Sequence, residues 1–311
     1  MLAKRECFKD FRFWCLTFAL LALVMLFLFP KIKRSGPAYQ MTFIVDITRS
    51  MNTEDYRYHG EIISRLEFVK MTLRELLSSL PCQSKVGLGV FTERRSSLLF
   101  QPIEVCSGFN ELDAAIAALD WQSAWAADSR IAHGLLNTLD MLKDDQETRL
   151  IFISDGHEAP PLNSRYGPDF SIVKDTIKGL IVGVGGLEPK PIPKFDQQGK
   201  RVGFYSADDV PHRSTFGESD LNPESIQGYD ARNAPFGSEA AVGSEHLSRL
   251  HEPYLKQLAA ETGLGYQRLT ETAAFNQALQ SEALAVNKDI WIDRRWQFAS
   301  IALLALLLVF I

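Results

Sequence analysis

The stretch MTFIVDITRS, residues 41–50, passes abruptly from a largely apolar run to a cluster of side-chain oxygens. The run MTFIVD predicts a short strand that is buried on both faces, as in a parallel sheet. Asp46, Thr48 and Ser50 lie at alternate positions, so their oxygen atoms can converge where that strand ends. Three interpretations of this stretch remain open: a helix N-cap, the nucleophile loop of a phosphatase, or part of a metal site.

The rest of residues 40–285 alternates between strand-like and helix-like segments. This alternation predicts an α/β fold, with a mostly parallel central sheet, one antiparallel edge strand and helices on both faces. We expect strands at 41–46, 86–92, 98–105, 149–156, 178–186, 201–205 and 265–269, and helices at 66–80, 111–119, 129–142, 246–263 and 271–286. Residues 187–245 are rich in proline, glycine and polar side chains, so we expect an irregular insertion there.

A second acidic side chain ends another apolar strand, RLIFISDG at 149–156, and it favours a metal site. Asp155 and Asp46 should share the carboxyl edge of the sheet, where ligands bind. Hard oxygen donors suit Mg²⁺, Mn²⁺ or Ca²⁺ better than zinc or copper. A phosphatase loop would need an acid at the position of Thr48. A serine hydrolase would need a G-x-S-x-G turn, which does not surround Ser154.

Three separated elements of the chain resemble the von Willebrand factor A domain. The marks of that family are an apolar strand ending in D-x-S-x-S, a later Thr or Ser that opens a helix, and a strand ending in D-G. The segment DITRS at 46–50 is similar to the first element, with a threonine for the first serine. Ser129 stands at the place of the second element, and Asp155-Gly156 at the third. The resemblance covers roughly residues 40–285 and implies a Rossmann-like fold.

The resemblance also implies a metal-ion-dependent adhesion site. By analogy, Thr48, Ser50 and Ser129 would bind a divalent cation directly, while Asp46 and Asp155 would act largely through bound water. Mg²⁺ is the expected ion, with Mn²⁺ or Ca²⁺ as alternatives. In the family, an open coordination position accepts a carboxylate from a partner protein. We therefore expect a binding protein rather than an enzyme.

Several side chains near this pattern are candidates for contact with a partner. They are Arg49, Trp121, Trp125, His157 and Glu158. The alternatives are internal packing for the two tryptophans and a solvated loop for His157 and Glu158. Two other functions stay open. One is a hydrolase in which the metal activates water and His157 or Glu158 is the general base. The other is a scaffold with a vestigial metal site.

Both ends of the chain carry charge-free apolar segments. Residues 13–29, after a basic tail at 1–12, predict a transmembrane anchor, and residues 296–311 predict a shorter second one. A cleaved signal peptide is the alternative for the first segment, but no A-x-A-like cleavage site follows it. The count of Lys and Arg is nearly balanced across the segments and leans slightly toward a cytoplasmic middle region.

A narrower resemblance points to the other orientation. The segments at 119–131 and 180–205, together with the two anchors, look like bacterial membrane-anchored A-domain proteins that occur with MoxR-type AAA+ ATPases. One subgroup assists the maturation of periplasmic methanol dehydrogenase, including calcium insertion. The resemblance implies an inner-membrane protein whose domain faces the periplasm, with such an ATPase and a dehydrogenase as partners. The net charge of −5 gives no reason to expect nucleic acid as a partner.

Two cysteines in the middle region are candidates for a disulfide. If Thr92 faces Leu98 across the predicted hairpin, Cys106 falls near Ser84 and therefore near Cys82. Two buried thiols are the alternative. A periplasmic domain would permit the bridge.

Overall fold

The computed structural model describes residues 11–124, 129–145, 147–159, 167–196, 198–210, 244–281 and 284–310. The chain divides into two compact units. One is Ala38–Val286, and the other combines Met1–Pro37 with Asn287–Ile311.

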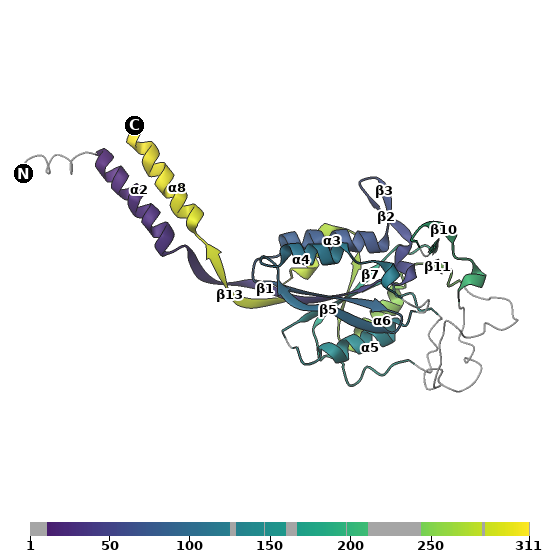
Figure 1. Ribbon diagram of the computed structural model, residues 1–311. Coiled ribbons are helices and arrows are strands. Elements are labelled where there is room, and N and C mark those ends of the chain that lie inside the picture. The colour runs from purple at the N-terminus through teal and green to yellow at the C-terminus, as the bar shows by residue number, and fades with distance from the viewer. Residues whose placement is uncertain are drawn as a thin grey trace, which may run out of the picture. The chain divides into compact units, whose positions relative to one another are not determined.

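A twisted sheet forms the centre of the larger unit (Figure 1). Its strands run in the order β12-β7-β6-β1-β4-β5, and β13 also pairs with β1. All neighbouring pairs in that order are parallel except β4 and β5. The expected parallel sheet with one antiparallel edge strand is therefore confirmed. The strands are β1 Lys31–Asp46, β4 Lys85–Thr92, β5 Arg95–Glu104, β6 Arg149–Ser154, β7 Gly179–Val184, β12 Gly265–Leu269 and β13 Ala285–Asp293.

Helices cover both faces of this sheet (Figure 1). α3 Arg65–Ser79, α4 Phe109–Ala117 and α7 Thr272–Leu279 pack on one face, and α5 Ile131–Leu142 and α6 Glu252–Thr262 pack on the other. Alternate side chains of β1 enter the two resulting cores. Met41, Phe43 and Val45 join the first core, and Ile44 joins the second. Burial on both faces explains why this strand appears in the sequence as an apolar run.

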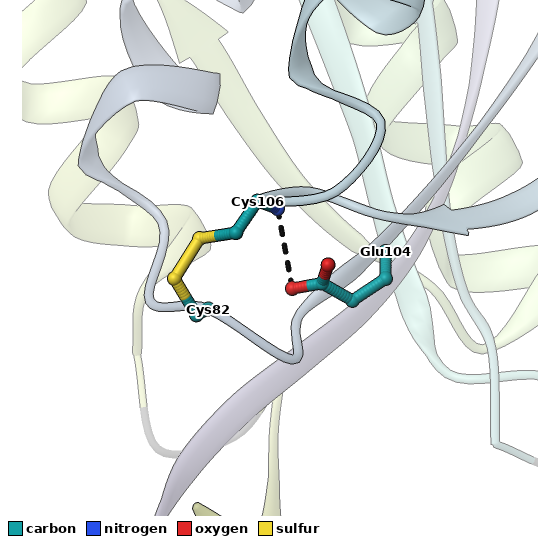
Figure 2. A group of neighbouring side chains, drawn as sticks. All are labelled: Cys82, Glu104 and Cys106. Carbon is teal, nitrogen blue, oxygen red and sulfur yellow. Dashed lines mark hydrogen bonds between the residues drawn. A yellow bond between two sulfur atoms is a disulfide. The ribbon is translucent and has the colours of Figure 1, made fainter. Parts of the chain in front are cut away.

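The β4–β5 hairpin is present, but its expected register is wrong. Thr92 pairs with Arg95 rather than Leu98, and two irregularities further along the ladder insert extra residues into β5. At the far end the Val105 amide, rather than that of Cys106, donates to the Ser84 carbonyl at 2.9 Å. Cys82 and Cys106 are nevertheless joined by a disulfide (Figure 2).

Two predicted helices are shorter than expected. The helix expected over 246–263 starts only at Glu252. Pro253 suits its first turn, where no helical N–H bond is lost, and the preceding residues Leu247–Ser248 form strand β11. The helix expected over 271–286 ends at Leu279, because Ala285 already belongs to β13, whose pairing with β1 replaces helical hydrogen bonds.

The insertion contains more strand than the single expected piece. β8 Lys190–Pro191 pairs with β11, and β9 Pro193–Phe195 pairs with β10 Arg201–Phe204. Residues 211–243 lie outside the described part. A further hairpin, β2 Glu54–Tyr58 with β3 Glu61–Ser64, occupies a stretch that the sequence showed only as polar. His59 and Gly60 at its turn both have positive φ, as a two-residue type I′ turn requires.

The smaller unit contains two apolar helices that lie side by side (Figure 1). They are α2 Phe11–Leu28 and α8 Arg295–Leu307, which continues into the 3₁₀ turn η6 Leu308–Phe310. Among the described residues, α2 is long and apolar enough to cross a membrane, whereas Arg295–Phe310 is a shorter apolar helix. The second membrane span therefore stays a prediction.

Candidate metal centre

Asp46 lies at the end of β1, on the carboxyl edge of the sheet, and its carboxylate is fully buried. Oδ1 accepts hydrogen bonds from the Thr48 amide at 2.8 Å and the Thr48 hydroxyl at 2.7 Å. Oδ2 accepts from the Ser154 hydroxyl at 2.7 Å. All three of these donors are neutral groups.

Thr48 and Ser50 bring their hydroxyl groups together beside Asp46. Thr48 precedes the short 3₁₀ turn η1 Arg49–Asn52 as its N-cap residue, yet its side chain makes no capping hydrogen bond. Its hydroxyl instead bonds to Asp46 and lies 3.3 Å from the Ser50 hydroxyl. The geometry therefore argues against the N-cap interpretation and leaves two adjacent oxygen donors.

Ser129 is held at the same edge by a backbone bridge to Ala159, with hydrogen bonds of 2.7 and 2.9 Å. Both residues line the small cavity that also contains Thr48 and Ser50. The Ser129 hydroxyl is buried and has no hydrogen-bond partner among the described residues. A buried hydroxyl without a hydrogen-bond partner lowers the folding stability by about 1–3 kcal/mol, and a ligand bound to the Ser129 oxygen would remove this cost.

Asp155 follows β6 and is fully buried. Its Oδ2 accepts from Arg65 Nη1 at 2.6 Å and from the Ser248 hydroxyl at 3.0 Å, and its Oδ1 accepts from the His157 amide at 3.0 Å. Burial alone would raise the pKa of Asp155, but the Arg65 guanidinium and the accepted hydrogen bonds outweigh it and lower that pKa. Asp155 is therefore held as a carboxylate.

Steric constraints favour glycine at position 156, directly after Asp155. Gly156 has φ +75°, and a Cβ there would lie 2.9 Å from the Leu255 side chain of α6. The chain can thus turn away from Asp155 while α6 packs closely against it.

Arg65 is a site residue that the sequence interpretation missed. Its side chain is 0% exposed, and it also donates from Nε and Nη2 to Asp55 Oδ2 at 2.9 and 2.7 Å. Nη1 donates to the Ser248 hydroxyl at 2.6 Å. An arginine at the start of a helix gives no local signal of burial, because its partners are distant in sequence.

The buried carboxylates around Arg65 outnumber its one positive charge. Asp46, Asp55, Asp155 and the Arg65 guanidinium together carry a formal charge of −2 when all four are ionised, and Arg130, next to Ser129, is the other buried arginine among the described residues. Burial, and then the charge of Asp155, raise the pKa of Asp46 to about 7. A divalent cation would balance this cluster, and the Thr48, Ser50 and Ser129 hydroxyls supply hard oxygen donors for it. The residues present therefore fit the expected ion.

The hydroxyl groups open into a small cavity of about 30 Å³. Its lining combines Thr48, Ser50 and Ser129 with four residues of the insertion at 187–245, which we call its outer wall. A volume of this size accommodates roughly two water-sized groups. The outer-wall residues are Ile192, Tyr205, Val210 and Glu245.

The candidate partner contacts lie in different surroundings. The Arg49 guanidinium lies over the Tyr205 ring, 5.3 Å from its centroid, and Trp121 packs on Phe195 at 5.2 Å. Trp121 thus packs within the domain, as its alternative interpretation expected. Trp125 lies outside the described residues.

His157 and Glu158 do not form the solvated loop that was the alternative for them. His157 is 5% exposed, because it packs edge to face with His251 beneath the insertion. Glu158 Oε1 accepts from the Ala132 amide in the first turn of α5 and from the Tyr254 hydroxyl. Its contacts are therefore internal, and it satisfies a free N–H of α5.

Residues 41–157 match the family model of the von Willebrand factor type A domain. No curated protein matches the chain. An aerotolerance-related membrane protein from Bacteroides fragilis is a similar solved structure, with 16% identity, 79% of this chain and 98% of that chain covered, and a TM-score of 0.48. BatB from Bacteroides thetaiotaomicron is another, with 17% identity, 78% and 96% coverage, and a TM-score of 0.49.

Proposed function

We propose, from the premise that the chain carries a von Willebrand factor type A domain, that this domain binds a partner protein through a divalent cation. The observation that carries the proposal is the buried Ser129 hydroxyl, which has no hydrogen-bond partner among the described residues and lines the same small cavity as the Thr48 and Ser50 hydroxyls beside the buried Asp46 carboxylate. Mg²⁺ is the ion we expect, with Mn²⁺ or Ca²⁺ as alternatives.

The roles of the residues follow from their hydrogen bonds. Asp46 Oδ1 accepts a hydrogen bond from the Thr48 hydroxyl, which leaves the lone pairs of that hydroxyl oxygen directed away from the carboxylate and available at the cavity that Thr48 lines. Ser154 fixes the second oxygen of Asp46, and Arg65 holds Asp155 in place. When bound, the cation would offer an electrophilic coordination position to a carboxylate of the partner. Direct ligation by neutral hydroxyls keeps that position electrophilic, because few negative charges reach the ion.

We further propose that the protein is anchored by both apolar helices. Small side chains are buried between α2 and α8, namely Cys15, Ala19, Ala22, Ala302 and Ala305, whereas large apolar side chains face outward. Close packing on small residues is typical of helix pairs within a bilayer. The Cys82–Cys106 disulfide supports a domain in the periplasm of a bacterium, since such bonds persist in oxidising compartments.

A protein that offers a carboxylate suits the expected metal site, and the earlier resemblance favours a MoxR-type ATPase and a periplasmic dehydrogenase whose maturation this protein assists. The hydrolase and the scaffold with a vestigial site remain alternative predictions.

Thermal unfolding of the detergent-solubilised full chain tests the metal. Millimolar Mg²⁺, Mn²⁺ or Ca²⁺ should stabilise the wild type relative to EDTA. At one hundred times Kd the gain is about 2.7 kcal/mol, or very roughly 5–10 °C for a domain of this size. Asp46→Asn and Ser129→Ala should lose that gain, while the exposed Asp113→Asn should keep it.

A wild type that shows no shift with any of the three ions would refute the metal site and favour the vestigial scaffold. Metal-dependent turnover that Glu158→Ala or His157→Ala removes would favour the hydrolase instead.

A further inference from the structure

We infer that Glu245 is a ligand that the chain supplies to its own metal site, in the coordination position that a partner's carboxylate would otherwise take. This inference rests on the proposed function and concerns the regulation of the same site. In the resting domain, Glu245 of the same chain would ligate the metal; we call this self-ligation. A partner would then bind only by displacing the Glu245 carboxylate.

Glu245 lies beside the hydroxyl groups of the proposed metal site. Glu245 lines the cavity of about 30 Å³ into which Thr48, Ser50 and Ser129 open. It is the one acidic side chain among the described residues of that lining. Its neighbours on the outer wall are Ile192, Tyr205 and Val210, so the insertion brings one carboxylate to the lining that the three hydroxyl groups share.

A second support is the way in which the backbone of Glu245 is held. The Leu247 amide donates to the Ser244 carbonyl at 2.8 Å, which closes a turn around Glu245, and the Ile192 amide donates to the His246 carbonyl. Three residues after Glu245, the Ser248 hydroxyl contacts both Asp155 and Arg65. The segment that presents Glu245 is thus tied directly to the proposed metal cluster.

A second cavity beside Glu245 can receive its carboxylate after a partner displaces it from the metal. Glu245 lines this larger cavity of about 760 Å³, and His157 also lines both cavities. His251 faces the larger cavity, and its ring packs edge to face with that of His157. A displaced carboxylate can therefore rotate toward two imidazoles without unfolding of the insertion.

Titration of the full chain with Mn²⁺, followed by electron paramagnetic resonance of the free ion, tests the inference. Glu245→Gln keeps the size of the side chain and removes its charge, so the Kd for Mn²⁺ should rise about tenfold or more. Added acetate should restore the affinity of this variant, because the coordination position is open, and should leave the wild type unchanged. Glu261→Gln is the matched control, because Glu261 lines only the larger cavity.

The outcomes separate the two claims. A wild type that does not bind Mn²⁺ refutes the proposed metal site, and the inference with it. If the wild type binds Mn²⁺ and Asp46→Asn does not, but Glu245→Gln binds within twofold of the wild type and ignores acetate, the metal site stands and self-ligation is overturned. Tighter binding by Glu245→Gln would overturn self-ligation as well.

Discussion

Replacing Arg65 by methionine should destabilise this protein far more than removing an exposed ion pair from the same helix. The guanidinium makes two hydrogen bonds to Asp55 and one to Asp155, of 2.6–2.9 Å, and all three side chains are at most 2% exposed. Methionine fills similar space but leaves both carboxylates without a cation. Breaking a buried pair in this way costs about 3–5 kcal/mol.

The same helix provides a matched control. Arg74 of α3 also makes two hydrogen bonds to a carboxylate, that of Asp113, at 2.6 and 2.9 Å. These side chains are 47% and 27% exposed, so water solvates both charges after the pair is broken. Arg74→Met should therefore cost only about 0–1 kcal/mol.

Thermal unfolding of the two variants in EDTA measures the difference. For a domain of this size, the Tm of Arg65→Met should lie on the order of 10 °C below that of Arg74→Met. Mg²⁺ should reduce this difference in Tm, because the cation would compensate the charge of Asp155 in place of Arg65. An Arg65→Met variant that unfolds within 1 kcal/mol of Arg74→Met would refute the claim that Arg65 compensates buried charge.

Two further predictions concern groups outside the hydroxyl cluster. Burial raises the pKa of Glu158 from 4.5 to about 7, so the folded state retains a proton that the unfolded state releases. This stabilisation is complete below about pH 4.5 and is lost as the pH rises through 7. In EDTA, the unfolding free energy of wild type minus that of Glu158→Gln should fall by up to about 3 kcal/mol between pH 4.5 and 8; a difference that stays flat with pH would contradict the assignment. The Cys82–Cys106 disulfide closes a loop with a sequence separation of 24, so replacing both cysteines by serine should cost about 3 kcal/mol. In intact cells, a membrane-impermeant thiol reagent should label these cysteines only after reduction, and labelling without reduction would argue against the bridge.

The parts of the fold that the sequence predicts are those that leave a local pattern. β6, β7 and residues 41–45 of β1 are covered on both faces, so they appear as largely apolar runs. Asp46 and Asp155 interrupt two of these runs at their carboxyl ends, and the parallel order of the sheet brings them to one edge.

The parts that the sequence does not predict depend on distant contacts. The register of β4 and β5 depends on two irregularities inside the ladder. The residues of the turn do not predict these irregularities. Arg65 bonds to Asp155, 90 residues away, and to Ser248, 183 residues away. The strand at Leu247–Ser248, where a helix was expected, likewise depends on a distant partner, because its backbone pairs with Lys190–Pro191 of the insertion.

The structure also separates two carboxylates that the sequence motif treats alike. Asp155 has a guanidinium partner, and that partner holds its pKa below the ordinary value. Asp46 has neutral donors, and burial raises its pKa to about 7. Asp46 is therefore the carboxylate that a bound cation would stabilise most. Asparagine at position 46 preserves the acceptor for Thr48, so it should abolish the response to metal with little cost to the metal-free fold. Neutralising Asp155 instead would leave Arg65 with less compensation and destabilise the domain even in EDTA.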